Sequence, residues 1–255
     1  RRPKPDDFQI KQAIEKIKKS KKPIIISGGG VFYSDAMDEL GSFAIKHNIP
    51  VTQTVMGYST MKRDHSHFLG PIGGLGGRAA NNLAKETDLA ICVGTKLADF
   101  TTGSWANFEN PEFKLVSINI ARHDANKHLA EAVIGDAKVC LSELSNSLGN
   151  WKSPDSWHKK SQDELKSWNE YVDKESGPTN QETPNYAHAV GAIYRNSDPT
   201  DIAVTAAGGL VGEVVQVWRP KELNTHETEW GFSCMSYEIS GALGIKMANP
   251  DKDVI

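Results

Sequence analysis

The chain has 255 residues, of which 38% are hydrophobic and 24% charged, with a formal net charge of −3 at pH 7. This balance is typical of a folded globular protein and provides no basic surface for nucleic acid or anionic membranes. The apolar runs are far shorter than the ~20 residues needed to cross a bilayer. Cys92, Cys140 and Cys234 have the spacing of neither a disulfide framework nor a zinc site, so we expect a protein of the reducing cytoplasm.

The two ends of the chain indicate a piece of a longer protein. The sequence begins at Arg1 without methionine and enters a Pro-rich segment that resembles an interdomain linker. It closes with a turn followed by Val254 and Ile255, which we interpret as the first residues of a strand. Because a strand needs backbone partners and a core, we expect the parent protein to continue beyond Ile255.

The first part of the chain predicts an α/β domain with a parallel sheet. Short β-branched runs such as residues 23–27 are typical of buried parallel strands, and segments with apolar residues at helical spacing separate them. This alternation predicts a sheet that is covered by helices on both faces. Helices are expected at residues 8–20, 36–47 and 79–85, and strands at residues 23–27, 49–54, 89–94 and 114–120.

The second part predicts a linker and then an incomplete α/β domain. Trp151, Trp157 and Trp168 lie among polar residues, so we expect a linker helix that places them on a domain surface, followed by a loop. The pattern beyond the loop predicts helices at residues 186–194, 211–217 and about 235–247, and a strand at residues 202–206.

Two glycine-rich segments and one polar loop could bind a ligand. Gly28–Gly30 could hold a phosphate, but the G-x-G-x-x-G spacing is missing, which favours a tight turn. Residues 70–77 fit close packing and ligand binding equally well. The polar residues after the strand at 89–94 could contact a polyhydroxylated ligand or cap the next segment. They are Lys96, Asp99, Thr101 and Thr102.

The histidines and cysteines predict no metal site or nucleophile. The pairs His65/His67 and His123/His128 lack the i,i+4 spacing with a nearby Glu, so we interpret them as surface or core histidines. Cys234 has no histidine nearby in sequence, which favours a small buried thiol.

Residues 229–248 are the most informative stretch. A loop of small residues opens a helix with one apolar stripe, formed by Met235, Ile239, Leu243 and Met247. Such a stripe is more typical of a core than of a cofactor contact, so this pattern alone predicts a helix packed against a sheet.

Several blocks resemble the thiamine-diphosphate-dependent enzymes over nearly the whole chain. Residues 231–244 are similar to the acetolactate synthase pattern around G-x-x-x-M-G, with Ser236 where Gly is usual. The closer similarity is to the ring hydrolases of inositol catabolism, which act on 3D-(3,5/4)-trihydroxycyclohexane-1,2-dione. The blocks are Gly94-Thr95, residues 99–105 (DFTTGSW), Asp124-Ala125 with Lys127-His128, residues 135–137 (GDA), residues 206–210 (AAGGL) and residues 231–235 (GFSCM) with 237–239 (YEI).

The resemblance implies a three-domain parent. Residues 1–148 would form its Rossmann-like central domain, residues 149–184 a linker, and residues 185–255 the N-terminal part of the diphosphate-binding domain. The implied cofactor-binding residues are Gly208, Gly209 and Leu210 near the diphosphate, and Phe232, Ser233, Cys234 and Met235.

Two of these residues have specific implied roles. Met235 would lie beneath the cofactor and force its bent shape, while its N–H donates to the pyrimidine ring. The Ser233 carbonyl would accept a hydrogen bond from the 4′-amino group. The activating glutamate would belong to an N-terminal domain, and the magnesium site would begin beyond Ile255. The resemblance thus implies no catalytic residue or metal ligand in this chain, and weak or absent cofactor binding by the chain alone.

For the parent, the resemblance implies hydrolysis of a carbon–carbon bond in a cyclic 1,2-diketone, giving 5-deoxyglucuronate. It implies thiamine diphosphate and Mg²⁺ as cofactors and a homodimer or homotetramer, without nucleic-acid or membrane partners. Two alternatives remain open: an acetolactate-synthase-like carboligase or decarboxylase acting on pyruvate, and a non-catalytic nucleotide-binding module. Gly28–Gly30 and residues 70–77 are where FAD or another nucleotide would bind, although the resemblance does not require one.

Overall fold

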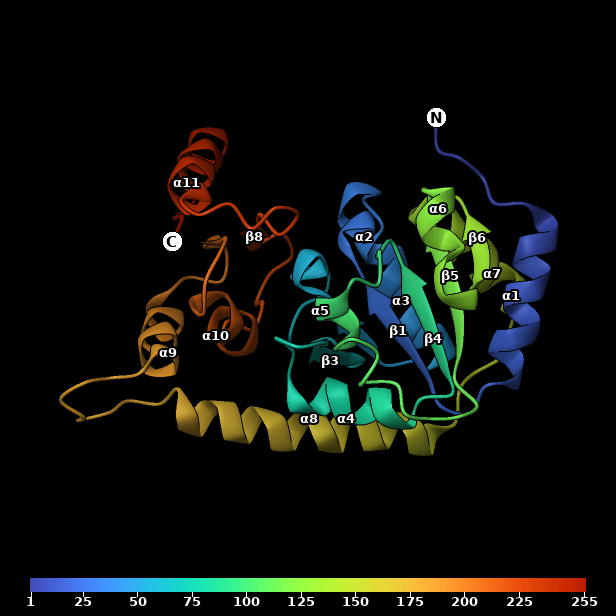
Figure 1. Cartoon of the computed structure of the whole chain (residues 1–255), viewed down its shortest axis with the longest axis horizontal. Coiled ribbons are helices and arrows are strands. Elements are labelled where there is room, and N and C mark those ends of the chain that lie inside the picture. The colour runs from blue at the N-terminus through green and yellow to red at the C-terminus, as the bar shows by residue number, and fades with distance from the viewer.

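Six parallel strands form the first sheet, in the order β3-β2-β1-β4-β5-β6 (Figure 1). The computed structural model describes residues 1–255. The chain pairs outward from β1 to β3 and then returns to place β4 beside β1, which is the strand order of doubly wound Rossmann-like folds. The predicted α/β parallel sheet is therefore confirmed. Its strands are β1 (Pro23–Ser27), β2 (Val51–Gln53), β3 (Phe68–Pro71), β4 (Leu89–Val93), β5 (Lys114–Asn119) and β6 (Glu131–Ile134).

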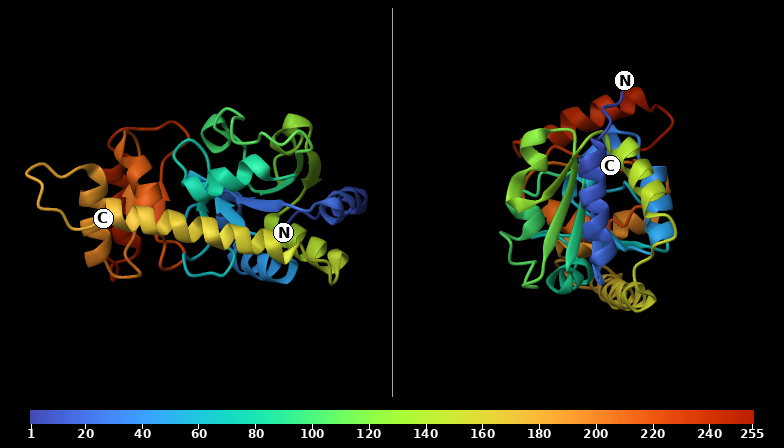
Figure 2. Two further views of the ribbon diagram at one scale, coloured as in Figure 1. Left: turned by 90° about the horizontal axis from the view of Figure 1, so that it is seen from below. Right: turned by 90° about the vertical axis from the view of Figure 1, so that its right-hand side faces the viewer.

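The central strands are buried on both faces because their side chains are apolar almost throughout. Every residue of β1 and β4 is buried, and Ile25 pairs with Val51 on one side and Ile91 on the other. Helices α3 and α7 pack together over one face, whereas α4 packs beside β3 (Figure 2). The helices are α1 (Asp7–Lys19), α2 (Gly29–Tyr33), α3 (Met37–His47), α4 (Arg78–Glu86), α5 (Asp99–Thr102), α6 (Arg122–Ala125) and α7 (Ala137–Leu148).

The sequence pattern did not predict β3, β6 and α7. Strand β3 contains Gly70 and Pro71, which are poor strand formers, and β6 lies at the sheet edge with only Val133 buried. Helix α7 does carry a helical pattern, since Cys140 and Leu144 are both buried. This spacing is a recognisable helical signal in the sequence.

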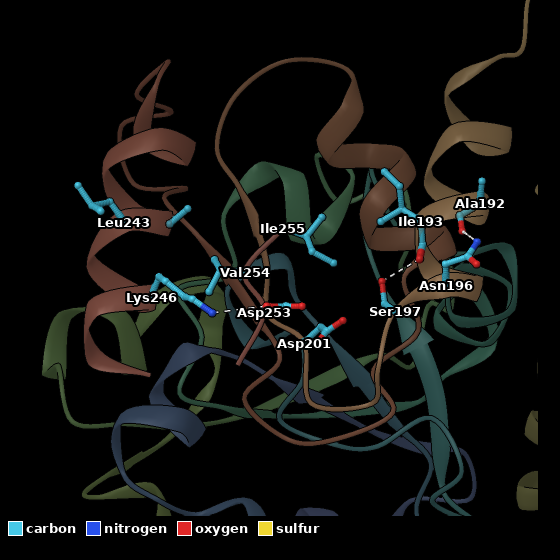
Figure 3. Close-up of a pocket in the computed structure, with 11 residues that line it drawn as sticks. Ala192, Ile193, Asn196, Ser197, Asp201, Leu243, Lys246, Asp253, Val254 and Ile255 are labelled. Atoms are coloured by element: carbon cyan, nitrogen blue, oxygen red, sulfur yellow. Dashed lines mark hydrogen bonds and ion pairs between the residues drawn. The ribbon is translucent and has the colours of Figure 1, made fainter. Parts of the chain in front are cut away.

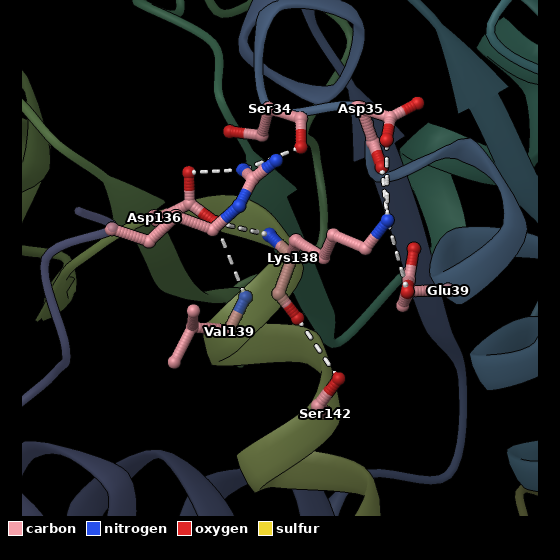
Figure 4. A network of polar contacts seen from close by, with 8 residues as sticks. Ser34, Asp35, Glu39, Asp136, Lys138, Val139 and Ser142 are labelled. Carbon is pink, nitrogen blue, oxygen red and sulfur yellow. Dashed lines mark hydrogen bonds and ion pairs between the residues drawn. The ribbon is translucent and has the colours of Figure 1, made fainter.

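The Gly-Asp-Ala block of the resemblance has a structural role at the start of α7. The Asp136 side chain accepts hydrogen bonds from the N–H groups of Lys138 and Val139, which caps the helix (Figure 4). Arg2 forms an ion pair with the same carboxylate at 2.8 Å. The Lys138 ammonium reaches back to Asp35, so this corner joins the chain start to the turn between α2 and α3.

One long helix, α8 (Asp155–Glu175), runs along the molecule and connects its two parts (Figures 1 and 2). The Trp157 indole is buried and donates to the Pro23 carbonyl at 2.8 Å. Trp168 is also buried, and a Cβ on Gly77 would lie 2.6 Å from its indole nitrogen. The expected helix, with tryptophans packed on the first part of the chain, is therefore confirmed, while Trp151 lies half-buried just before it.

Two parallel strands form the centre of the C-terminal part, and three helices surround them. Residue Val254 adds a parallel bridge to Ile202, which confirms that the last residues begin to pair as a strand. None of the helices is both long enough and apolar enough to cross a lipid bilayer. The elements are α9 (Tyr186–Asn196), β7 (Ala203–Thr205), α10 (Leu210–Val217), β8 (His226–Thr228) and α11 (Tyr237–Ala248).

The apolar stripe of α11 is not buried, which corrects the expectation of a helix packed into a core. The four stripe residues are between 62% and 84% exposed, and α11 has no buried residue. The physical reason is that α11 packs chiefly against β7, a strand of a very small sheet. The helix itself is confirmed, but its apolar face has no partner within this chain. The stripe residues are Met235, Ile239, Leu243 and Met247.

A small apolar cluster and a buried arginine hold the two parts together. Val211 and Val215 of α10 pack against Val55 and Tyr58, which follow β2. Arg219 is 6% exposed, and its guanidinium donates to Asn169 and Asp173 on α8. The sequence pattern predicted neither contact, because each joins residues that are far apart in the chain.

His226 should make the stability of this junction depend on pH. Burial lowers its pKa to about 4, against about 6.5 in an unfolded chain. Between these pH values the unfolded state binds more protons than the folded state, so the free energy of unfolding rises with pH and reaches its full value above about pH 6.5. We expect the free energy of unfolding to fall by on the order of 3 kcal/mol as the pH falls to 4, measured by urea unfolding.

The control for this prediction is His226→Phe, which keeps a ring against Tyr58, whose ring centroid lies 5.2 Å away. We expect the free energy of unfolding of the variant to depend less on pH than that of the wild-type protein. A residual slope should remain, because burial and the neighbouring His158 also lower the pKa of His67 to about 4. Parallel profiles for the two proteins would contradict the assignment to His226.

Candidate functional site

The seven residues predicted to bind a cofactor lie in two loops at one edge of the small sheet. Strands β7 and β8 are parallel, with Thr205 opposite Thr228, so the chain leaves both strands at the same edge. One loop leads to Gly208, Gly209 and Leu210, and the other contains residues 232–235. Ligands of open parallel sheets bind at the carboxyl ends of the strands. The structure therefore places the two predicted segments at the same edge of the sheet.

The loop after β7 leaves its backbone accessible. Gly208 has a φ of +94°, a conformation that favours glycine, and Gly209 is the N-cap of α10. A Cβ at either glycine would meet no atom within 4 Å. Leu210, the first residue of α10, is 45% exposed. The first N–H groups of α10 are therefore oriented toward an open edge, where a helix favours an anion.

The loop after β8 presents two exposed apolar side chains and two backbone polar groups. Phe232 is 90% and Met235 84% exposed. The Ser233 carbonyl and the Met235 N–H make no hydrogen bond within the chain. Glu229 accepts hydrogen bonds from the N–H groups of Phe232 and Cys234. Glu229 is a functional residue that the family resemblance does not imply, although a carboxylate just before a loop of small residues is a recognisable signal for backbone capping.

Cys234 is exposed, so its expected burial is wrong. It lies in the loop before α11, outside any core, because the Phe232–Ser236 segment is exposed throughout. Partial desolvation and the Glu229 carboxylate raise the pKa of the Cys234 thiol. A raised thiol pKa disfavours a thiolate nucleophile at neutral pH.

The histidines are core or surface residues, as expected. His67 is buried and stacks on His158 with ring centroids 4.1 Å apart, whereas His123 and His128 are exposed. The chain contains no group of three or more His, Cys, Asp or Glu side chains arranged to hold a metal ion.

The glycine-rich segments of the first sheet bring backbones into close contact. A Cβ on Gly30 would lie 2.6 Å from the Gly94 Cα, so Gly28–Gly30 form the tight strand-to-helix turn that the sequence favoured. Gly73 has a φ of +109°, and the Gly74 N–H donates to the Phe100 carbonyl at 2.7 Å. Packing thus accounts for this part of residues 70–77.

The polar loop after β4 gathers no convergent set of side chains. Lys96 and Asp99 are exposed, Thr101 is half-buried, and Thr102 is buried, with its hydroxyl accepting from the Trp105 N–H. The loop does reach the candidate site at one point, because the Phe100 ring packs edge-on against Trp230 at 5.1 Å.

A separate hollow of about 840 Å³ lies between α9, α11 and the last residues of the chain (Figure 3). Lys246 points toward Asp253 across it, with their charged atoms 3.4 Å apart. Its wall includes Ile193 and Leu243 but none of the seven predicted cofactor residues. Size alone therefore does not identify the functional site.

The two loops fit thiamine diphosphate in their donor chemistry. Open glycine backbone at a helix N-terminus suits a diphosphate, and a free carbonyl beside a free N–H suits an aminopyrimidine edge. The fit does not extend to the metal, because no carboxylate cluster lies within the chain.

The chain is similar to known proteins in two comparisons. The family profile described as "Thiamine pyrophosphate enzyme, central domain" matches residues 10–144. Proteins named 3D-(3,5/4)-trihydroxycyclohexane-1,2-dione hydrolase are similar over nearly the whole chain. The one from Clostridium perfringens (strain 13 / Type A) is 36% identical over 269 residues, which cover 96% of this chain and 42% of the relative.

Two further relatives with that name show the same coverage. The Bacillus anthracis (strain CDC 684 / NRRL 3495) protein is 36% identical and the Clostridium tetani (strain Massachusetts / E88) protein 37% identical, each over 274 residues. Both alignments cover 98% of this chain and 42% of the relative, so the chain spans less than half the length of these proteins. Because the profile match extends over more than half of the 255 residues, the chain belongs to the thiamine pyrophosphate enzyme family and carries its central domain at residues 10–144.

Proposed function

We propose that this chain is part of a thiamine-diphosphate-dependent hydrolase that opens the ring of 3D-trihydroxycyclohexane-1,2-dione to 5-deoxyglucuronate in inositol catabolism. The observation that carries the proposal is the position of the 206–210 and 229–236 loops at one sheet edge, with the Ser233 carbonyl and the Met235 N–H free of hydrogen bonds within the chain. The names of relatives at 36–37% identity support this substrate over pyruvate.

The proposed domain division is a central domain at residues 1–148, a linker at 149–184 and part of the diphosphate-binding domain at 185–255. Helix α8 and its buried tryptophans support the linker. The three cysteines are free thiols, which agrees with a reducing compartment such as the cytoplasm.

In the proposed site, Gly208, Gly209 and Leu210 hold the diphosphate through backbone N–H groups. Ser233 and Met235 orient the aminopyrimidine, and the Met235 side chain supports the bent shape of the cofactor. Phe232 and Cys234 flank these contacts. When bound, the cofactor supplies the electron sink for carbon–carbon cleavage, and the protein supplies orientation.

The remaining parts of the proposed site come from outside this chain. We propose that the activating glutamate and the Mg²⁺ ligands belong to other segments of the full-length protein. The parallel pairing of Val254 with Ile202 supports this for the metal, since a strand continuing there would run toward the same sheet edge as β7. The exposed α11 stripe supports a homodimer or homotetramer, because large exposed apolar patches mark interfaces.

The test is ring-diketone hydrolysis by the full-length protein, with and without thiamine diphosphate and Mg²⁺. We expect turnover that requires both cofactors, and no turnover in a parallel assay with pyruvate. Turnover of pyruvate alone would agree with the family assignment but would contradict the proposed substrate. The protein would then be a carboligase or decarboxylase. Nucleotide binding without any turnover would favour a non-catalytic module instead.

A further inference from the structure

Glu229 holds the backbone of the loop that follows β8. One carboxylate oxygen accepts from the Phe232 N–H at 2.8 Å and the other from the Cys234 N–H at 2.7 Å. Such charge-assisted bonds are stronger than neutral ones. Donation by Cys234 and then by Phe232 lowers the pKa of Glu229, so the carboxylate is ionised at neutral pH.

These bonds set the direction of the two backbone groups that the proposed site needs. The Ser233 carbonyl and the Cys234 N–H belong to one trans peptide unit, in which they point in opposite directions. Because the N–H points at Glu229, the Ser233 carbonyl points away from it.

The next peptide unit is oriented in the same way. The Cys234 carbonyl accepts from the Tyr237 N–H at 3.2 Å, so the Met235 N–H in that unit points away from the start of α11. Neither the Ser233 carbonyl nor the Met235 N–H is used within the chain. Both groups therefore lack a hydrogen-bond partner within the chain.

The loop needs the hydrogen bonds to Glu229 because its backbone is strained. Ser233 has a φ of 52° and Ser236 a φ of 73°, both in the left-handed region that disfavours residues other than glycine. Strained residues persist where surrounding contacts over-determine them. The two Glu229 bonds bracket Ser233 and provide that constraint.

Glu229 itself is well anchored on both sides. Thr228, the last residue of β8, is buried, and Trp230 packs edge-on against Phe100 of α5 at 5.1 Å. The carboxylate therefore extends from a fixed backbone to a loop whose side chains are exposed.

We propose that Glu229 is a positioning residue, which preorganises residues 232–235 so that the Ser233 carbonyl and the Met235 N–H face the aminopyrimidine of the cofactor. This inference rests on the proposed function of the loop as a thiamine diphosphate site. Preorganisation raises affinity by removing the ordering penalty from binding.

The first test uses the 255-residue chain without cofactor. In Glu229→Ala we expect amide hydrogen exchange at Phe232 and Cys234 to be at least about tenfold faster, with a smaller effect in Glu229→Gln, which keeps one acceptor oxygen. Glu238→Gln is the matched control, because it removes a nearby carboxylate that forms no hydrogen bond or ion pair with the loop. Unchanged exchange in Glu229→Ala would overturn the proposal.

Alkylation of Cys234 by iodoacetamide gives a second readout in the same chain. Cys234 is the exposed thiol, whereas Cys92 and Cys140 are buried. Removing the Glu229 charge should lower the Cys234 pKa and speed alkylation, while Glu238→Gln should not. A rate in Glu229→Ala equal to that of the control would also count against the proposal.

The second test measures thiamine diphosphate affinity in the full-length protein by calorimetry with Mg²⁺. We expect Kd to rise at least about tenfold in Glu229→Ala, less in Glu229→Gln and not in Glu238→Gln. Faster exchange with an unchanged Kd would reject positioning and leave the proposed function intact. Absence of binding by the wild-type protein would instead reject the proposed function, and with it this inference.

Discussion

The Gly30→Ala variant is expected to lose about 3 kcal/mol of its free energy of unfolding, which is a drop of about 6–12 °C in Tm. The added Cβ would lie 2.6 Å from the Gly94 Cα and 3.0 Å from its carbonyl oxygen. Both are backbone atoms, so no side chain can rotate away. The Gly30 N–H also donates to the Gly94 carbonyl at 2.9 Å, and this bond fixes β1 against β4 at the centre of the sheet. Urea unfolding of the chain measures the effect.

Gly244→Ala is the matched control for this prediction. Gly244 lies inside α11, and a Cβ there would meet no atom within 4 Å. Stability should therefore stay the same or rise by up to about 1 kcal/mol, because alanine favours a helix over glycine. If Gly30→Ala and the wild-type protein had equal free energies of unfolding, the prediction would be wrong, because the turn could then make room for a Cβ without loss of stability.

Met235→Ala in the full-length protein is expected to lower kcat by about 10²-fold, since small displacements of a reacting group have effects of that size. Met235 is 84% exposed in this chain and supports no core, so the fold should remain intact. The proposed role of its side chain is to support the bent cofactor, which alanine is too short to do. Met235→Leu, with a similar volume, should recover most of the activity.

Met247→Ala, in the helix that follows the loop, is the control. Its side chain is 76% exposed and belongs to the same stripe, but it lies three turns away from the loop after β8. We expect steady-state kinetics like those of the wild-type protein. A similar loss in both variants would indicate that the stripe acts through assembly rather than through the cofactor.

Local patterns in the sequence were sufficient for most elements of the first sheet. Residues 23–27 and 89–93 are strands and residues 79–85 are helical, as predicted, because β-branched runs and helical spacing are properties of neighbouring residues. Strand β3 escaped prediction because Gly70 and Pro71 form a strand only when β2 is already there to pair with them.

The candidate site was only partly predictable. The seven residues predicted to bind a cofactor follow from a resemblance, and no local rule would have placed Gly208 and Met235 in loops that leave the same sheet edge. Glu229 precedes a loop of small residues, which is a general signal for backbone capping, but which N–H groups it binds depends on the shape of the loop. The apolar character of Cys234 and of the α11 stripe predicts burial in a core, and this chain does not form that core.

The sequence by itself thus determined the alternating α/β pattern, the helix that carries Trp157 and Trp168 and, through shared motifs, the thiamine pyrophosphate enzyme family. Only the tertiary structure decided which apolar face is covered, which glycines touch another backbone and which loops share an edge. The reason is physical. Secondary structure follows from contacts along the chain, whereas burial and convergence depend on pairings such as β7 with β8, whose partners lie far apart in sequence.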